Sequence, residues 1–314
     1  MYSFNYRLID PLGIDQENYL KIHNELFKSS SINKDWLIWY HKKIVLTNEK
    51  LGKTRTYGLF DKEKLIGIWS VEPKFLRNDD DCIIKVGRCF AVGISAEYRR
   101  MGLFVSLSEY AIREEIKLSE CEYIIGFPQT GRSVIGGHLK AGWKEIQLNN
   151  IYSFNTENLI EKKYRKDINL LTDFNIITKY YNGNNSFVEN GSYKNARYLQ
   201  HPTHQYLTYY YGNSYIVLKN FSTFCHILDI NGEEQEINTL IESCKSICKR
   251  HGLSEINVWC HEKYKYFKSI NECGFKIGAK FGLPITIIAV NIKSSNNFQI
   301  SNSFNFGMGV EEGY

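Results

Sequence analysis

The sequence has no apolar run long enough to cross a membrane and no start typical of an exported protein. Its longest apolar segment, LPITIIAV at 283–290, has the length of a strand, whereas a spanning helix needs about 20 apolar residues. The first residues, MYSFNYRLIDPLG, lack a charged start followed by an apolar stretch, so we expect no signal peptide. These absences predict a cytoplasmic protein with no membrane span.

Dense charge of one sign is also absent. The formal net charge of +5 is mild for 314 residues, and the densest charged run is EKKYRKD at 161–167. A protein that binds a nucleic-acid groove usually carries a denser basic stripe. The balance therefore favours anionic small molecules, such as phosphates, and no nucleic-acid partner is expected.

The eight cysteines include no CxxC pair. Cys244 and Cys248 lie one helical turn apart inside an amphipathic pattern, with no second pair to complete a zinc site. We expect buried, reduced thiols and no metal.

Two halves of the chain share one order of elements. In the first half, a helical stretch at 15–50 precedes paired strands in 56–73, a long strand at 83–94, a helix at 104–118 and a strand at 122–129. A helix at 133–143 ends near Gly142, a plausible C-cap, and two strands, KEIQL and IYSFN, follow.

The second half repeats this order more loosely. A helix or turn in NARYLQHPTHQYL is followed by strands at 206–212, 214–220 and 223–230, a helix at 236–252, a strand at 254–260 and a helix ending at Gly274. We expect KIGAKFG to pair with ITIIAVNI, and NFQIS and SFNF of the tail to continue a sheet.

A repeat of roughly 130 residues indicates duplicated domains rather than a solenoid. The predicted fold class is α/β (α+β), with a mixed, mostly antiparallel twisted sheet flanked by helices in each half. The predicted domains are residues 1–156 and 157–314, with the seam in the charged stretch 156–172.

The segment EYRRMGLFVSLS joins the long strand of the first half to its helix. A helix N-terminus presents free backbone N–H groups and a favourable dipole for an anion. Gly102 allows a phosphate to approach closely, and Arg99 and Arg100 can add charge-assisted hydrogen bonds. The loop is therefore a candidate pyrophosphate site, although arginines before a helix are also common as plain surface charge.

The order of strand, Arg99-x-x-Gly102, helix, strand, helix with Gly142-Trp143, and strand pair resembles the GNAT superfamily of acyl-CoA-dependent N-acyltransferases. The loop motif of that superfamily is Gln/Arg-x-x-Gly-x-Gly/Ala, and here Phe104 replaces the final small residue. The resemblance covers about 75 residues of the first half well, and the second half by topology only. It implies two tandem GNAT-like domains.

The resemblance also implies a binding mode for acyl-CoA, either acetyl-CoA or hydroxybutanoyl-CoA, as co-substrate. Its pyrophosphate would lie on the amides of the loop, and its pantetheine would pair with the long strand like an added strand. Gln129 and Ser133 are further candidates for holding the pantetheine or the edge of coenzyme A. The implied cofactor residues are Val92, Gly93, Ile94, Arg99, Arg100, Met101, Gly102, Leu103, Phe104, Gln129 and Ser133.

In this superfamily, a backbone N–H of the long strand commonly stabilises the oxyanion, which here would fall at Phe90 or Ala91. The proton for the leaving thiolate often comes from a tyrosine, and His138 takes its place in this sequence. An imidazole can also donate a proton. The alternative is a ring that only faces the cofactor edge or solvent. The equivalent position in the second half is Ile270, and LDINGEEQEIN offers acids in place of the loop. Only the first half is expected to bind coenzyme A.

Tandem members with GFP and a serine after the buried strand resemble a branch of polysaccharide (lipopolysaccharide or O-antigen) biosynthesis. That likeness implies a nucleotide-linked, often dTDP-linked, amino sugar as the acceptor. The second half offers four candidate contacts, and an ordinary structural role is the alternative for each: His201, His204, Tyr209 and Asp229.

Several alternatives stay open at this point. The acceptor amine could belong to a peptide, a protein or an aminoglycoside-like molecule, or the chain could transfer an aminoacyl group from tRNA, against which the intact loop and mild charge argue. A non-catalytic acyl-CoA sensor is the non-enzymatic reading. The sequence leaves the acyl group, the sugar, a dedicated general base and a homodimer undetermined.

Overall fold

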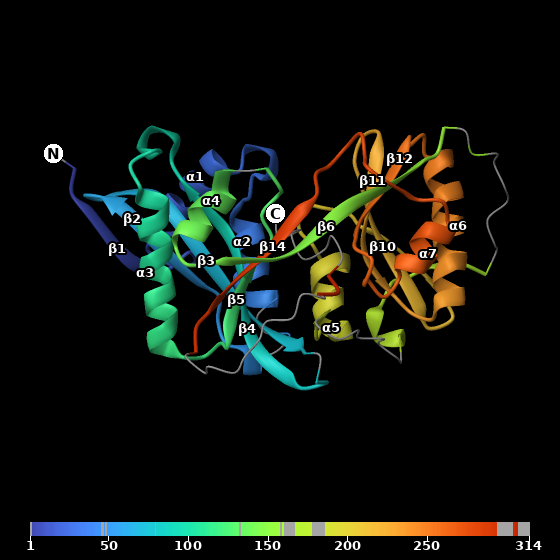
Figure 1. Ribbon diagram of the computed structural model, residues 1–314, viewed down its shortest axis with the longest axis horizontal. Coiled ribbons are helices and arrows are strands. Elements are labelled where there is room, and N and C mark those ends of the chain that lie inside the picture. The colour runs from blue at the N-terminus through green and yellow to red at the C-terminus, as the bar shows by residue number, and fades with distance from the viewer. Residues whose placement is uncertain are drawn as a thin grey trace.

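The computed structural model describes residues 2–44, 47, 49–78, 80–131, 133–157, 159, 167–177, 186–293 and 304–306. Figure 1 shows two halves side by side, joined by two strands that run between them. We call residues 1–156 the first half and residues 157–314 the second half.

The elements of the first half follow the predicted order. Its strands are β1 (Phe4–Ile9), β2 (Arg55–Asp61), β3 (Lys64–Arg77), β4 (Ile83–Ile94), β5 (Tyr123–Gly126) and β6 (Lys144–Asn155). Its helices are α1 (Gln16–Leu26), α2 (Lys34–Ile38), α3 (Leu103–Leu118) and α4 (Ser133–Lys140), with a π-helical turn at Trp39–Ile44 and short 3₁₀ turns at Lys28–Ser30, Glu49–Leu51 and Ala96–Tyr98.

The second half repeats the same succession. Its strands are β7 (Asn169–Leu170), β8 (Ser186–Phe187), β9 (Leu207–Tyr211), β10 (Ser214–Asn220), β11 (Phe224–Asn231), β12 (Glu255–Cys260), β13 (Lys276–Ile277) and β14 (Ile285–Asn291). Its helices are α5 (Gly191–Lys194), α6 (Glu234–Arg250) and α7 (Phe267–Glu272), with a 3₁₀ turn at Phe174–Ile176 and a π-helical turn at Asn195–Leu199.

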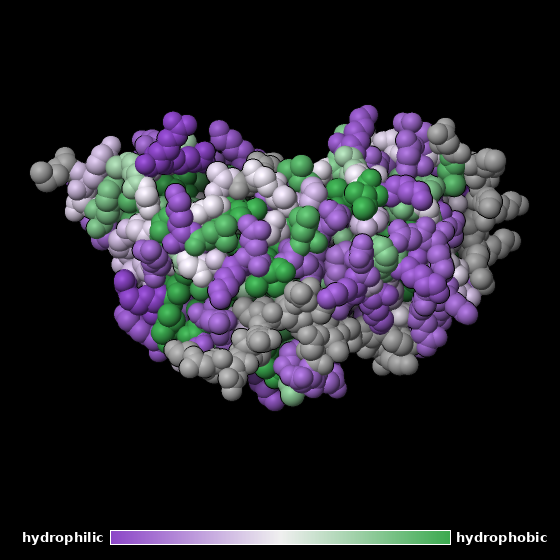
Figure 2. All heavy atoms as spheres, viewed as in Figure 1, coloured by the Kyte–Doolittle hydropathy of each residue, from purple (hydrophilic) through white to green (hydrophobic). Residues whose placement is uncertain are grey.

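Helices cover both faces of the first half's sheet. On one face α3 buries Leu107 and Ala111 against Trp69 and Ile124. On the other face α1, α2 and the turn after α2 form an aromatic layer over Phe90. In the second half α6 buries an apolar stripe, while hydrophilic side chains cover the outer surface around it (Figure 2).

The described strands form one continuous mixed sheet in the order β1-β2-β3-β4-β5-β14-β6-β12-β11-β10-β9-β7. The pairs β4–β5 and β11–β12 are parallel, and the other neighbours on this path are antiparallel. The predicted fold class, with mostly antiparallel sheets and flanking helices, is confirmed.

The two halves exchange their last strands. β6 begins beside β14, with Lys144 opposite Ala289, and ends beside β12, with Asn155 opposite Glu255. β14 in turn pairs with β5 of the first half through Ile288 and Gly126. Each half therefore completes its sheet with a strand that the other half supplies.

Two predictions of strand pairing and one of strand number were wrong, because sequence periodicity shows neither where a strand ends nor which strand lies beside it. KEIQL and IYSFN are one strand, β6, and KIGAKFG contributes only β13, which pairs with β6. ITIIAVNI pairs with β5 and β6 instead. Residues 304–306 of the tail are not in a strand, and NFQIS lies outside the described residues. The division at residues 156 and 157 stays a prediction.

Candidate active site

The parallel strands β4 and β5 separate after only two pairs of residues. Gly87 lies opposite Ile124 and Arg88 opposite Ile125, whereas β4 continues to Ile94. Between Cys89 and Ile94 this edge of β4 is not paired with β5, so its backbone groups can accept an extended ligand.

A β-bulge lies in this open part of β4. The pairing with β3 shifts between Ile68 and Ser70, and Ala91 has a φ of 47°. A bulge leaves one residue unpaired and redirects its backbone groups out of the ladder. Phe90 and Ala91, the predicted oxyanion donors, are therefore at the irregular point of the strand, and both are buried.

The loop between β4 and α3 has the geometry of an anion site. Arg100 has a φ of 67° and Gly102 a φ of 77°, so two residues adopt the left-handed conformation just before the helix. The amides of Val105 and Ser106 are bonded to the Gly102 carbonyl, which leaves the amides of Leu103 and Phe104 ahead of the first helical turn.

Space around this loop is open. A Cβ added to Gly102 would meet no atom of the described residues within 4 Å. The side chains of Arg100 and Met101 are exposed, and the Arg99 Nε donates to the Ile94 carbonyl at 3.2 Å. Successive backbone N–H groups in such a conformation form a concavity that favours anions.

The Phe104 side chain does not fill the space beside Gly102. Its ring packs on α4, where a Cβ added to Gly137 would lie 2.5 Å from the ring. The departure from a small residue at this position is accommodated by a glycine on the neighbouring helix.

His138, a residue of α4, lies between two aromatic rings. Its ring is 5.0 Å from that of Phe104 and 4.7 Å from that of Trp143, and the residue is 4% exposed. Burial lowers the pKa of His138 to about 4, so the ring is neutral near pH 7. Within the described part of the chain, its buried Nδ1 has no hydrogen-bond partner.

Gln129 and Ser133 flank the end of β5. Gln129 forms an isolated bridge with Ile285 at the start of β14, and Ser133 is the exposed first residue of α4. The neighbouring Thr130 amide donates to the Pro284 carbonyl at 2.8 Å. The exchanged strand of the second half therefore fixes this segment.

The structure brings one of the four second-half candidates, His201, to the contact between the halves, and His204 lies beside it. His201 stacks on His204 with ring centres 5.0 Å apart and lies 4.3 Å from the Trp39 ring of the first half. Burial, followed by the nearby His204, lowers the pKa of His201 to about 3. Asp229 forms an ion pair with Lys194 at 2.5 Å.

Tyr209, the fourth candidate, is a half-buried residue of β9, where it lies opposite Ile216 and Leu170. It packs against the second half's own core under α6. This position is the one expected of a structural tyrosine.

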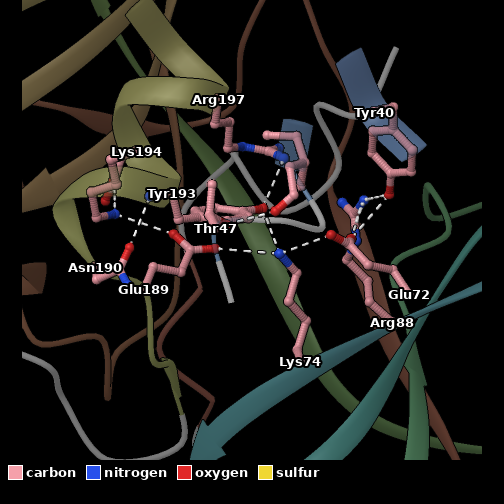
Figure 3. Close-up of polar contacts among 12 residues, drawn as sticks. Tyr40, Thr47, Glu72, Lys74, Arg88, Glu189, Asn190, Tyr193, Lys194 and Arg197 are labelled. Atoms are coloured by element: carbon pink, nitrogen blue, oxygen red, sulfur yellow. Dashed lines mark hydrogen bonds and ion pairs between the residues drawn. The ribbon is translucent and has the colours of Figure 1, made fainter. Parts of the chain in front are cut away.

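Sequence reasoning missed a buried polar network beside the open strand (Figure 3). Glu72 on β3 forms ion pairs with Arg88 at 2.8 Å and Lys74 at 3.0 Å. The Tyr40 hydroxyl donates a hydrogen bond to the same carboxylate at 3.0 Å. The Tyr40 ring in turn lies 5.2 Å from that of Phe90. The network therefore touches the residue at the predicted site of transfer.

The same network extends into the second half. Lys74 donates to the hydroxyl of Tyr193 and lies 3.9 Å from the Glu189 carboxylate. Glu189 also pairs with Lys194 at 3.2 Å, which leads to Asp229. We call Tyr40, Glu72, Lys74, Arg88, Glu189, Tyr193, Lys194, Arg197 and Asp229 the interhalf network.

One signal for it was present in the sequence. In SVEPKF, Glu72 and Lys74 alternate within a strand and therefore share one face. The aromatic layer of α1 and α2 covers this face of the sheet.

No group of three or more His, Cys, Asp or Glu side chains able to hold a metal occurs in the described part of the chain. Among those same residues, no helix is long and apolar enough to span a bilayer.

No family model and no curated protein matches this sequence. Solved structures match over most of the chain. An Enterococcus faecalis V583 protein described as a probable N-acyltransferase is 12% identical, with a TM-score of 0.65 over 92% of this chain and 73% of its own. A GCN5-related N-acetyltransferase from Anabaena variabilis is 14% identical, with a TM-score of 0.63 over 93% and 73%.

A GCN5-related N-acetyltransferase from Kribbella flavida gives a TM-score of 0.61 at 9% identity, over 91% of this chain and 71% of its own. At these identities the likeness concerns the fold. The chain therefore has the fold of the GCN5-related N-acetyltransferases over nearly its whole length, which agrees with the predicted resemblance.

Proposed function

We propose that this chain is an acyl-CoA-dependent N-acyltransferase. The observation that carries the proposal is the continuity of the open edge of β4 with the loop at Arg100 and Gly102. A single extended ligand can bond the backbone of the strand and end with an anionic group on the loop. Acyl-CoA has this combination of an amide-bearing arm and a pyrophosphate.

In this proposal the pyrophosphate binds the amides of residues 99–104, with Arg99 and Arg100 adding charge. The pantetheine pairs with Val92, Gly93 and Ile94, and Gln129 and Ser133 hold its edge. The acyl group is acetyl or a hydroxyacyl group such as hydroxybutanoyl.

The acceptor amine attacks the thioester carbon as a neutral nucleophile. The C–N bond forms as the C–S bond breaks, the amine proton passes to water, and the thiolate takes up a proton. The backbone near Phe90 and Ala91 stabilises the oxyanion, an effect on the order of 10²–10³ in rate. Because burial lowers its pKa to about 4, His138 is neutral near pH 7, so in this proposal it donates an N–H hydrogen bond to the thiolate while water supplies the proton.

We propose a nucleotide-linked, dTDP-type amino deoxysugar of surface polysaccharide synthesis as the acceptor. His201, His204 and Asp229 are its proposed contacts, and the position of His201 against Trp39 supports a site shared by both halves. Tyr209, which packs against the second half's own core, is left out of this proposal. An amine of a peptide, protein or aminoglycoside-like molecule is the alternative acceptor. The buried, neutral state of His138 favours a second function, a non-catalytic acyl-CoA sensor.

The test is release of free thiol from acetyl-CoA and hydroxybutanoyl-CoA with a panel of dTDP- and UDP-linked amino sugars, free amino sugars and peptide amines. Turnover with a nucleotide sugar and none with the free sugar is the expected result. Coenzyme A binding without turnover for any amine would contradict transfer and leave the sensor. His138→Ala separates the two functions in an active protein, because turnover should fall while coenzyme A binding persists.

A further inference from the structure

The interhalf network contains charged side chains that water hardly reaches. Glu72 is 4% exposed, Lys74 3%, Arg88 2%, Lys194 5% and Arg197 3%. Charged residues are rarely buried to this extent, and a buried ion pair is often no more stabilising than apolar side chains of the same volume. Stability alone therefore gives little reason for this network, and its position suggests a role in binding.

Positive charge prevails among the described members of the network. Lys74, Arg88, Lys194 and Arg197 face the three carboxylates of Glu72, Glu189 and Asp229. Although burial raises the pKa of Glu72, Arg88 and Lys74 outweigh it and hold the pKa at about 2. Glu72 is therefore charged near pH 7 and stays paired with both cations.

The network runs from solvent to the proposed transfer site. Its two partly exposed ends are the side chains of Glu189, 18% exposed, and Asp229, 21% exposed. Its inner end is Arg88, whose guanidinium lies 5.3 Å from the Phe90 ring. A ligand that enters from the second half would first meet the carboxylates of Glu189 and Asp229, with Lys74 and Lys194 directly behind them.

Glu189 lies between the partly exposed Asp229 end of the network and Lys74. It lies 3.2 Å from Lys194 but 3.9 Å from Lys74, so its contact with Lys74 is the looser of the two. An incoming anion could take the place of this carboxylate beside Lys74 and keep the hydrogen bond to Tyr193 within reach.

We propose that the interhalf network binds an anionic group of the acceptor, a phosphate or a carboxylate, and thereby directs the acceptor's amine to Phe90 and Ala91. This inference rests on the proposed function for the transfer itself. Anion recognition by the network does not depend on turnover, so the two can be tested separately.

The first experiment measures binding of dTDP, inorganic pyrophosphate and succinate by calorimetry, with coenzyme A at saturation so that the loop at Gly102 is occupied. Glu189→Gln removes the competing carboxylate and should tighten binding of the favoured anion about fivefold to tenfold. Lys74→Met should weaken it at least about tenfold, and Lys74→Arg should restore most of it. Preference for dTDP and pyrophosphate identifies phosphate, and preference for succinate identifies a carboxylate.

Glu242→Gln is the matched control, since Glu242 pairs with Lys245 on α6 away from the network. It should leave all affinities unchanged. Because Glu189 is partly exposed, its variant tests the proposal even if Lys74→Met fails to fold. Equal affinities for Glu189→Gln and the wild type, or weaker binding in Glu189→Gln, would overturn the proposal.

The second experiment compares turnover of one amino sugar as its nucleotide diphosphate, its 1-phosphate and its uncharged methyl glycoside. The charged forms should exceed the glycoside in kcat/KM by about 100-fold, and Glu189→Gln should widen that ratio. Equal kcat/KM for the three forms overturns anion recognition but leaves transfer intact. Absence of coenzyme A binding and turnover overturns the proposed function, while the calorimetric result still decides the role of the network.

Discussion

The two halves share a fold and differ at the junction of the long strand with its helix. In the first half the glycine of this junction, Gly102, faces open space. In the second half the space beside the corresponding Gly232 is occupied, since an added Cβ would lie 1.8 Å from the Ser214 hydroxyl oxygen. The Gly232 amide donates to the Tyr266 hydroxyl at 2.8 Å, and the Glu233 amide donates to Ser214 at 3.0 Å.

The charge at the two helix N-termini differs as well. The first turn of α3 has no acidic residue, whereas α6 begins with Glu234 and Glu236. Carboxylates at this place satisfy the helix dipole themselves and repel a phosphate. One half has kept the geometry of an anion site, and the other has used the same geometry for internal hydrogen bonds.

The later helices are equivalent at the level of single hydrogen bonds. The Trp143 amide donates to the His138 carbonyl at 3.2 Å, and the Phe275 amide donates to the Ile270 carbonyl at 3.2 Å. His138 and Ile270 therefore occupy the same position, as the sequence predicts. The duplicated fold alone specifies neither a proton donor nor an anion site.

The largest expected effect concerns the independence of the halves. Residues 1–156 lack β14, which pairs with β5 and fills the core under α3 through the buried Ile288. Alone, this fragment should fail to fold, because the edge of β5 and a core residue lose their partners. Circular dichroism and urea unfolding of the fragment check this.

A second fragment tests whether the missing β14 is the cause. Joining residues 284–293 to the end of the first fragment through a flexible linker should restore cooperative unfolding. Cooperative unfolding of the fragment 1–156 without this addition would contradict the structural role of the exchanged strand.

The next effect concerns the loop. Gly102→Asp places a carboxylate at the N-terminus of α3 and should weaken coenzyme A binding about 100-fold through repulsion and the strained left-handed backbone. Calorimetry with coenzyme A measures it. Gly252→Asp is the control, since Gly252 also has a positive φ, 71°, and open space around it. Equal loss of affinity in both variants would show that the loop is not the binding site.

Much of the fold could be predicted from local pattern. The long strand 83–94 and the helix at 104–118 were correct to within a residue, because hydrophobic periodicity and the Gly102 junction act locally. The exchange of β6 and β14 could not be predicted, since either strand has the apolar character needed to pair with β5 or β12. Pairing of that kind depends on contacts between residues far apart in the chain.

The candidate site likewise has one part that could be predicted from the sequence and another that could not. The left-handed loop before α3 was predictable because its shape depends on Gly102 and its immediate neighbours in the sequence. The interhalf network was not, since Glu72 and Lys74 meet Tyr193 and Glu189 only after the two halves pack together. The burial of His138 was likewise unpredictable, because it depends on Phe104 and Trp143 lying on both sides of the ring.

The smallest expected effect concerns this buried histidine. Its pKa is lowered from 6.5 to about 4 in the folded protein, so between these values the unfolded chain binds a proton that the folded protein does not. The free energy of unfolding should therefore fall as the pH falls from 6.5 to 4. From pH 7 to pH 5 His138 should contribute a loss of roughly 2 kcal/mol.

His138→Ile, which gives the first half the residue of the second, should remove this part of the pH dependence. Urea unfolding at pH 7 and pH 5 measures the difference, with the exposed His251→Asn as the control that leaves it unchanged. Other buried histidines, such as His226, maintain a residual slope in all variants because burial lowers their pKa as well. If His138→Ile keeps the full slope, folding does not lower the pKa of His138. In that case part of the His138 rings would be imidazolium near pH 6.5, and this ring rather than water could protonate the thiolate.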